Sequence, residues 1–65
     1  SISDELSLHD FRMVTGPTHT NLIFDLVVPF DFSIKDDELK ELIQKKVAAR
    51  DSFYCTVINI DKNYV

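Results

Sequence analysis

The residues of this chain that could do chemistry are side chains that ligate metal ions. The candidates are imidazole, carboxylate and amide groups in predicted strands and at the start of a predicted helix: His9, Asp25, Asp36, Asp37, Glu38, Asn59 and Asp61. Imidazole nitrogens and carboxylate oxygens both bind divalent cations. Metal binding therefore has to be weighed against ordinary structural roles for the same residues.

Asp25 is the most informative candidate, because it interrupts an otherwise apolar stretch at residues 22–28. An unpaired carboxylate is costly to bury, so a partner, a cation or water must meet it. Arg12 in the preceding segment could form a salt bridge with Asp25, and a subunit boundary could leave the carboxylate exposed. The residues alone favour these two interpretations over a metal site.

Catalysis and nucleic-acid binding find little support in the sequence. No serine or cysteine stands in a recognisable nucleophile motif, and a single glycine excludes a glycine-rich phosphate loop. Cys55, the only cysteine, cannot form an internal disulfide, and its position within a strand predicts a buried, inert thiol. The net charge of −4 has the wrong sign for binding nucleic acid. We therefore expect no enzymatic activity.

The length of 65 residues allows one small domain. An apolar content of 45% with 28% charged residues argues against a disordered chain. No apolar run approaches the roughly 20 residues of a membrane span, and no secretory signal pattern is present. We expect residues 1–65 to be a single domain that faces the cytosol, and a first residue other than Met suggests a piece of a longer protein.

Periodicity predicts an α+β fold in the order strand, strand, helix, strand. The strands are expected at residues 6–14, 21–28 and 53–60, and a short turn makes the first two a hairpin. Ser33 is the expected N-cap of the helix, whose acidic first turns and basic end complement the helix dipole. The predicted architecture is one helix on a three-stranded sheet.

Side-chain patterns predict which surfaces meet. Alternation in the first strand places Leu6, Leu8, Asp10 and Arg12 on one face and Ser7, His9, Phe11 and Met13 on the other. The helix has one apolar stripe, formed by Leu39, Leu42, Ile43 and Val47. One helix cannot cover both sheet faces, so the bare face needs a further helix or another subunit. The crossover makes the second and third strands parallel, whereas the place of the first strand stays open.

Taken in order, several segments resemble the cytoplasmic C-terminal domain of cation diffusion facilitator transporters. The likeness rests on Leu8-His9-Asp10-Phe11-Arg12, the Gly16-Pro17 turn, the Val27-Val28-Pro29 strand end, and residues 56–61 followed by Tyr64-Val65. It covers nearly the whole chain, and the order of the motifs is more specific than any one of them.

The resemblance implies both a fold and a function. Members of this family are dimeric membrane transporters that export divalent cations such as zinc, manganese or iron. Their C-terminal domain is ferredoxin-like or metallochaperone-like, dimerises, and in many members binds metal. The expected function is thus the cytoplasmic dimerisation and metal-sensing domain of a cation efflux transporter. Its expected partners are a second copy, the transmembrane domain of the same chain and a divalent cation, on the cytoplasmic side of the cell membrane. The alternative is a free-standing metallochaperone-like or protein-interaction module without a transport role.

Metal ligands follow from the resemblance residue by residue. His9 matches a first-strand histidine of the family, and Asp61 matches the aspartate of its last-strand motif. Asp25 and Asn59 stand where many members have histidine. The resemblance thus implies that His9, Asp25 and Asp61 converge on a divalent cation, with Asp36 or Asp37 as a further ligand. Zinc favours nitrogen and sulfur, whereas carboxylate-rich sites suit harder ions such as manganese. The domain then binds a harder cation, binds zinc weakly, or serves only to dimerise.

Overall fold

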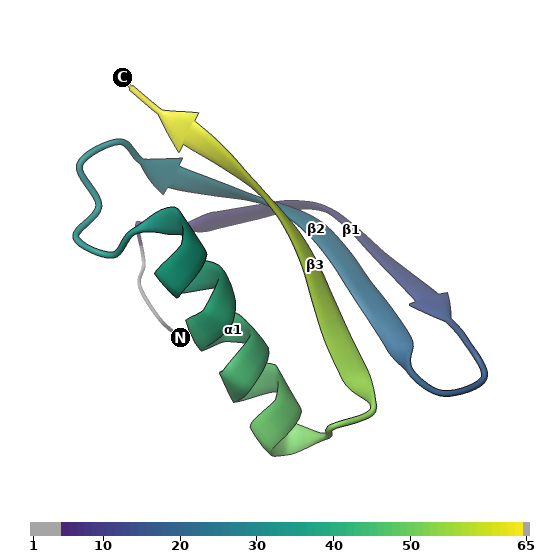
Figure 1. Ribbon diagram of the computed structural model, residues 1–65. Helices are drawn as coiled ribbons and strands as arrows, with labels where there is room; N and C mark the ends of the chain where they lie inside the picture. The colour runs from purple at the N-terminus through teal and green to yellow at the C-terminus, as the bar shows by residue number, and fades with distance from the viewer. Residues whose placement is uncertain (1–4, 65) are drawn as a thin grey trace.

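A computed structural model of the chain describes residues 5–64 and has the expected α+β architecture. Strands β1 (Ser7–Thr15) and β2 (Thr20–Pro29) form a hairpin, which is followed by helix α1 (Asp36–Arg50) and strand β3 (Tyr54–Asn63) (Figure 1). The predicted order of strand, strand, helix, strand is confirmed. No helix within residues 5–64 is long and apolar enough to cross a membrane.

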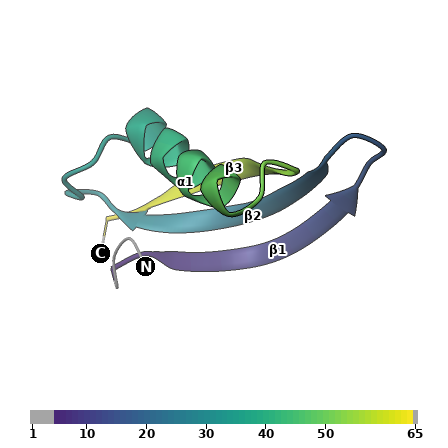
Figure 2. The ribbon, with the colours of Figure 1, turned by 90° about the horizontal axis from the view of Figure 1, so that it is seen from below.

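The three strands form one mixed sheet in the order β1-β2-β3. β1 pairs antiparallel with the central strand β2, and β3 pairs parallel with it across the α1 crossover. The first strand, whose place the sequence left open, therefore lies at an edge. α1 packs on one side of the sheet, and β1 is the strand farthest from it (Figure 2). No element within residues 5–64 covers the opposite side of the sheet.

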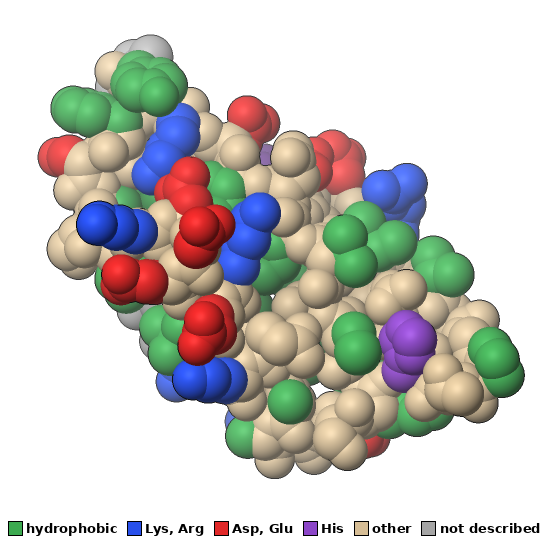
Figure 3. Space-filling model, viewed as in Figure 1, with side chains coloured by type: hydrophobic (Ala, Val, Ile, Leu, Met, Phe, Trp, Pro, Cys, Tyr) green, Lys and Arg blue, Asp and Glu red, His purple; other side chains and the backbone are tan. Residues whose placement is uncertain are grey.

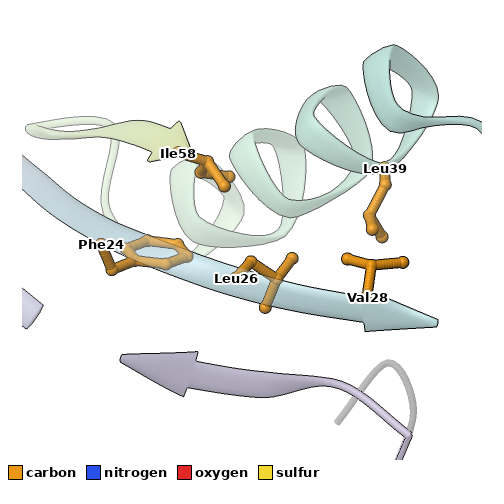
Figure 4. Packing of buried hydrophobic residues seen from close by; sticks show 5 residues of the cluster. All are labelled: Phe24, Leu26, Val28, Leu39 and Ile58. Carbon is orange, nitrogen blue, oxygen red and sulfur yellow. The ribbon is translucent and has the colours of Figure 1, made fainter. Parts of the chain in front are cut away.

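The hydrophobic core lies between α1 and the sheet. Its buried members are Phe24, Leu26 and Val28 of β2, Leu39 of α1 and Ile58 of β3 (Figure 4). Alternate β2 residues face the helix, as the period of a strand requires. Leu39 points toward Val28, and both side chains are 0% exposed. The predicted helix stripe is confirmed at Leu39 and at the partly buried Ile43, which packs against the same core.

The prediction that Ser33 caps the helix is wrong. The N-cap residue is Lys35, which has extended backbone and makes no side-chain capping bond. Phe32 and Ile34 pack against the core, and the chain turns at residues 30–31 and bends at residues 33–34 before the helix begins. The Lys35 carbonyl accepts a hydrogen bond from the Leu39 N–H at 2.8 Å. Three acidic side chains in the first turn stabilise this helix end, because their negative charges lie near the positive end of the helix dipole.

A β-bulge interrupts β1 and overturns the predicted side-chain alternation. The register passes from His9 opposite Asp25 to Arg12 opposite Ile23, so β1 contains one extra residue at this point. Asp10, inside the bulge, has φ of 54°, in the left-handed region that residues other than glycine seldom adopt. Nothing in the alternation of residue types signals this irregularity.

The bulge exchanges the two faces of β1. Met13 is opposite Leu22, and Phe11 stacks on Phe24 with ring centroids 6.3 Å apart, so both lie on the helix side of the sheet. A regular strand would place them beside His9, on the other side. Arg12 correspondingly shares its face with His9, contrary to the prediction.

Replacing Asp10 by glycine should raise the free energy of unfolding by about 0.5–1 kcal/mol, because glycine adopts a φ of 54° without the steric cost of a Cβ atom. Urea unfolding followed by circular dichroism measures the change. Asp10→Ala is the control, since it removes the carboxylate but keeps Cβ, and it should not stabilise. Equal stabilisation by both substitutions would show that charge, rather than backbone strain, is responsible.

Candidate functional site

The side of the sheet turned away from α1, which we call the open face, consists of the alternate strand residues that do not enter the core. These are Ser7, His9, Arg12 and Val14 of β1, Asn21, Ile23, Asp25 and Val27 of β2, and Cys55, Val57, Asn59 and Asp61 of β3. The assignment follows from register, because residues opposite each other in a sheet share a face. The neighbouring positions of β2, occupied by Phe24, Leu26 and Val28, are buried on the helix side.

Three of the candidate ligands form a single row across the open face. His9 is opposite Asp25, and Asp25 is in turn opposite Asn59. Residues directly opposite each other have Cβ atoms about 4.5–5.5 Å apart. The imidazole of His9 and the carboxylate of Asp25 are therefore neighbours, with the Asn59 amide on the far side of Asp25. His9 and Asn59 are exposed and Asp25 is half-buried.

Asp61 shares the open face but stands one row away. It is opposite Val27, which places it diagonally from Asp25 at about 7–8 Å. It is also two strands from His9, a separation of about 9.5 Å in the hydrogen-bonding direction alone. Within residues 5–64, no three His, Cys, Asp or Glu side chains lie close enough together to hold a metal ion. The structure thus brings together His9 and Asp25, with Asp61 nearby.

The two helix candidates, Asp36 and Asp37, lie on the other side of the sheet. Asp36 Oδ1 forms an ion pair with Lys62 Nζ at 2.8 Å. Lys62 is opposite Val28 and so belongs to the helix side of β3. This contact attaches the first turn of α1 to the end of β3. The structure does not bring Asp36 or Asp37 to the row that contains His9.

The salt bridge considered for Asp25 is not formed. The bulge places Arg12 opposite Ile23, and the ion pairs of the described residues join Lys45 to Glu41 and Lys62 to Asp36. Asp25 therefore has no ion-pair partner within residues 5–64. A half-buried carboxylate without an ion-pair partner is left for water, a cation or a second protein chain.

Large apolar side chains are exposed on both sides of the sheet. Val14 and Val57 on the open face are 52% and 49% exposed. On the helix side of β1, Leu8, Phe11 and Met13 are at least 51% exposed, because α1 packs over β2 and β3 only. In the view of Figure 3, charged side chains gather over α1, whereas the hairpin end of the sheet shows mostly uncharged ones. The predicted bare face is thus present, and the sequence did not reveal the second exposed surface.

Cys55 departs from its prediction as a buried thiol. It is a free cysteine, half-buried on the open face and opposite Asn21. It lies at the end of the sheet where β3 begins, two rows from the row that contains Asp25.

Comparison with known proteins gave no match: no family model, no curated protein and no solved structure matches this chain. A function therefore has to be argued from the fold, the open face and the sequence motifs.

Proposed function

We propose that this chain is the cytoplasmic dimerisation and metal-sensing domain of a divalent-cation efflux transporter. The observation that carries the proposal is the row of His9, Asp25 and Asn59 on the open face. These are the positions of the first, second and third strands at which the resemblance to cation diffusion facilitators places metal ligands. In addition, Asp25 has no ion pair within the described residues to compensate its charge.

The chemistry of the row suits weak, exchangeable metal binding. One imidazole, one carboxylate and one amide leave much of a coordination sphere to water, and oxygen-rich sites favour harder ions such as manganese over zinc. His9 and Asn59 are exposed, so a cation can enter and leave the open face without rearrangement of the core. A second copy placed against the same face would supply further ligands, which would link metal binding to dimerisation.

A free-standing metallochaperone-like or protein-interaction module is the competing proposal. The exposed apolar side chains on both faces of β1 support it, because such a surface also suits a protein partner. The coding sequence upstream of Ser1 separates the two proposals. Hydrophobic membrane-spanning segments in that region are expected for the transporter domain, and an initiation codon immediately before Ser1 would overturn the transport role.

Isothermal titration with Mn²⁺ and Zn²⁺ at pH 7.5 should show binding in the micromolar to sub-millimolar range. His9→Ala and Asp25→Ala should each raise the dissociation constant at least about tenfold, since each removes one of few protein ligands. Affinity should also fall in more acidic buffer, because imidazole and carboxylate ligands bind metal in their deprotonated forms.

Two matched controls report on nonspecific effects of the substitutions. His19→Ala removes an imidazole in the hairpin turn, and Asp36→Ala removes a carboxylate on the helix side of the sheet. Both variants should bind the ions as tightly as the native chain. Metal sensing would be refuted if the native chain binds neither ion below about millimolar concentration, or if the His9 and Asp25 variants bind unchanged.

A further inference from the structure

β3 has one free edge, and its backbone groups divide into an inward and an outward set. The Phe53 and Asn63 carbonyls accept hydrogen bonds from the N–H groups of Thr20 and Phe30, at either end of β2. The register between β2 and β3 has no shift along its whole length. Odd-numbered residues of β3 therefore direct their backbone groups toward β2, and even-numbered residues direct theirs outward.

Two local contacts close the first half of this edge. The Tyr54 N–H donates to the Asp51 carbonyl at 3.2 Å. The N–H and the hydroxyl of Thr56 both donate to Gln44 Oε1, each at 2.6 Å, so a side chain of α1 satisfies the edge at this point. Beyond Thr56, the outward N–H groups of Ile58, Ile60 and Lys62 have no hydrogen-bond acceptor within the described residues.

This second half of the edge is nevertheless held in a regular strand. The Phe30 N–H binds the Asn63 carbonyl at 2.9 Å, and the rings of Phe30 and Tyr64 stack with centroids 5.8 Å apart. The Asp36 to Lys62 ion pair fixes the same region to α1. A regular strand with unpaired, pre-ordered backbone groups is a template for the addition of another strand.

We propose that residues 58–62 of β3 pair antiparallel with the same residues of a second copy of this chain, about a two-fold axis at Ile60. Ile60 then faces Ile60 of the second copy, and Ile58 faces Lys62. Each of the three outward N–H groups gains a carbonyl acceptor on the other chain. The two sheets merge into one six-stranded sheet that carries both helices on the same side.

The side chains of this segment are complementary to themselves in that register. On the open face, Asn59 comes opposite Asp61 of the second copy, so each amide can donate to a carboxylate. On the helix side, the two Ile60 side chains meet at the axis and extend the partly buried apolar cluster. Opposite residues of this kind stabilise an antiparallel pair. The segment matches a second copy without requiring any other partner.

The other edge of the sheet does not offer the same pairing. The bulge at Asp10 breaks the regular spacing of backbone groups in β1, a feature that hinders strand addition at an edge. Pairing of β3 with β1 of another copy would also build open-ended arrays, whereas β3 with β3 closes as a two-fold dimer. The proposal rests on this edge alone and does not depend on metal binding or on a transport role.

Concentration-dependent hydrogen exchange tests the pairing residue by residue. At micromolar concentration, the amides of Ile58, Ile60 and Lys62 should exchange rapidly, and at millimolar concentration their exchange should slow at least about tenfold. The amides of Asn59 and Asp61, which face β2, are internal controls and should be protected throughout. A weak dimer is expected, because one strand pair buries less area than a standard interface.

Lys62→Pro and Lys62→Ala form a matched pair of variants. Both lose the ion pair with Asp36, but only proline removes the outward N–H, and proline is tolerated at an edge where that group faces solvent. Sedimentation equilibrium should give a dimer dissociation constant at least about tenfold higher for Lys62→Pro than for Lys62→Ala, since two intermolecular hydrogen bonds are lost. The native chain and Lys62→Ala should agree within about threefold.

The possible outcomes separate this proposal from the proposed function. A native chain that stays monomeric at millimolar concentration overturns the β3 pairing. A dimer in which Ile58, Ile60 and Lys62 still exchange rapidly also overturns it, but leaves dimerisation through another surface, such as the open face, in place. Titration of Mn²⁺ on Lys62→Pro then reports whether the His9 row binds metal independently of the β3 pairing.

Discussion

Leu39→Ala should lower the free energy of unfolding by about 2–5 kcal/mol, the usual loss when a buried leucine is truncated and a cavity remains. Leu39 is the one fully buried residue of α1, and its side chain points directly at Val28. A chain of this length has a total stability of roughly 3–10 kcal/mol. The expected loss is therefore a large fraction of the total stability, and the midpoint of urea unfolding should fall markedly.

Urea denaturation of Leu39→Ala and Leu39→Met isolates the cavity from other effects. Methionine nearly conserves the volume and should cost less than about 1.5 kcal/mol. Lys40→Ala, on the exposed side of the same helix, should stay within about 0.5 kcal/mol of the native chain. A loss below about 1 kcal/mol for Leu39→Ala would mean that α1 does not depend on Leu39 for its attachment to the sheet.

The strands and the helix were predictable from the sequence, because the spacing of their apolar residues has the period of each element. The second strand and the helix stripe each bury one continuous set of side chains, from Phe24 to Val28 and from Leu39 to Ile43. Burial of such a set fixes the period, so the residue types alone identify the element. The third strand continues to Asn63, three residues beyond its predicted end, because polar residues there still pair with β2.

The irregular features depend on backbone geometry that residue types do not encode. The bulge in β1 is detectable only from the register and from the φ of Asp10. The helix starts after Lys35 because the core holds Phe32 and Ile34 in place, which outweighs the intrinsic capping preference of Ser33. At the helix start, a tertiary contact rather than a local propensity decides the structure.

For the candidate site, the sequence permitted a shared face but could not fix which residues are neighbours. Alternation permitted His9 and Asp25 to share a face, and the register makes them direct neighbours. It did not indicate that Asp61 would fall one row away, because that separation depends on how β3 is aligned with β2. Asp36 and Asp37 could not be placed from the sequence at all, since the side of the sheet on which the helix packs determines their position.

Phe24→Ala should be comparably damaging, with an expected loss of about 3–5 kcal/mol in the free energy of unfolding. Phe24 is 6% exposed at the middle of the central strand, and it belongs to the cluster that joins β2, β3 and α1. It also stacks on Phe11 across the bulge in β1. Its removal leaves a cavity bordered by β2, β3 and α1, and a markedly lower midpoint of urea unfolding is the expected observation.

Phe11→Ala is the matched control, because it removes the other ring of the same stacked pair. Phe11 is 51% exposed, so its loss should cost about 0.5–1.5 kcal/mol, the value of an aromatic pair at a partly solvated site. The two substitutions therefore separate burial from stacking. Equal losses at the two positions would contradict the exposure of Phe11 and would indicate that, in solution, another chain or segment covers the helix side of β1. If Phe11→Ala also raises the dimer dissociation constant, a second copy of the chain is what covers the helix side of β1. An unchanged constant would leave β3 as the dimer edge, and the helix side of β1 free for a different partner.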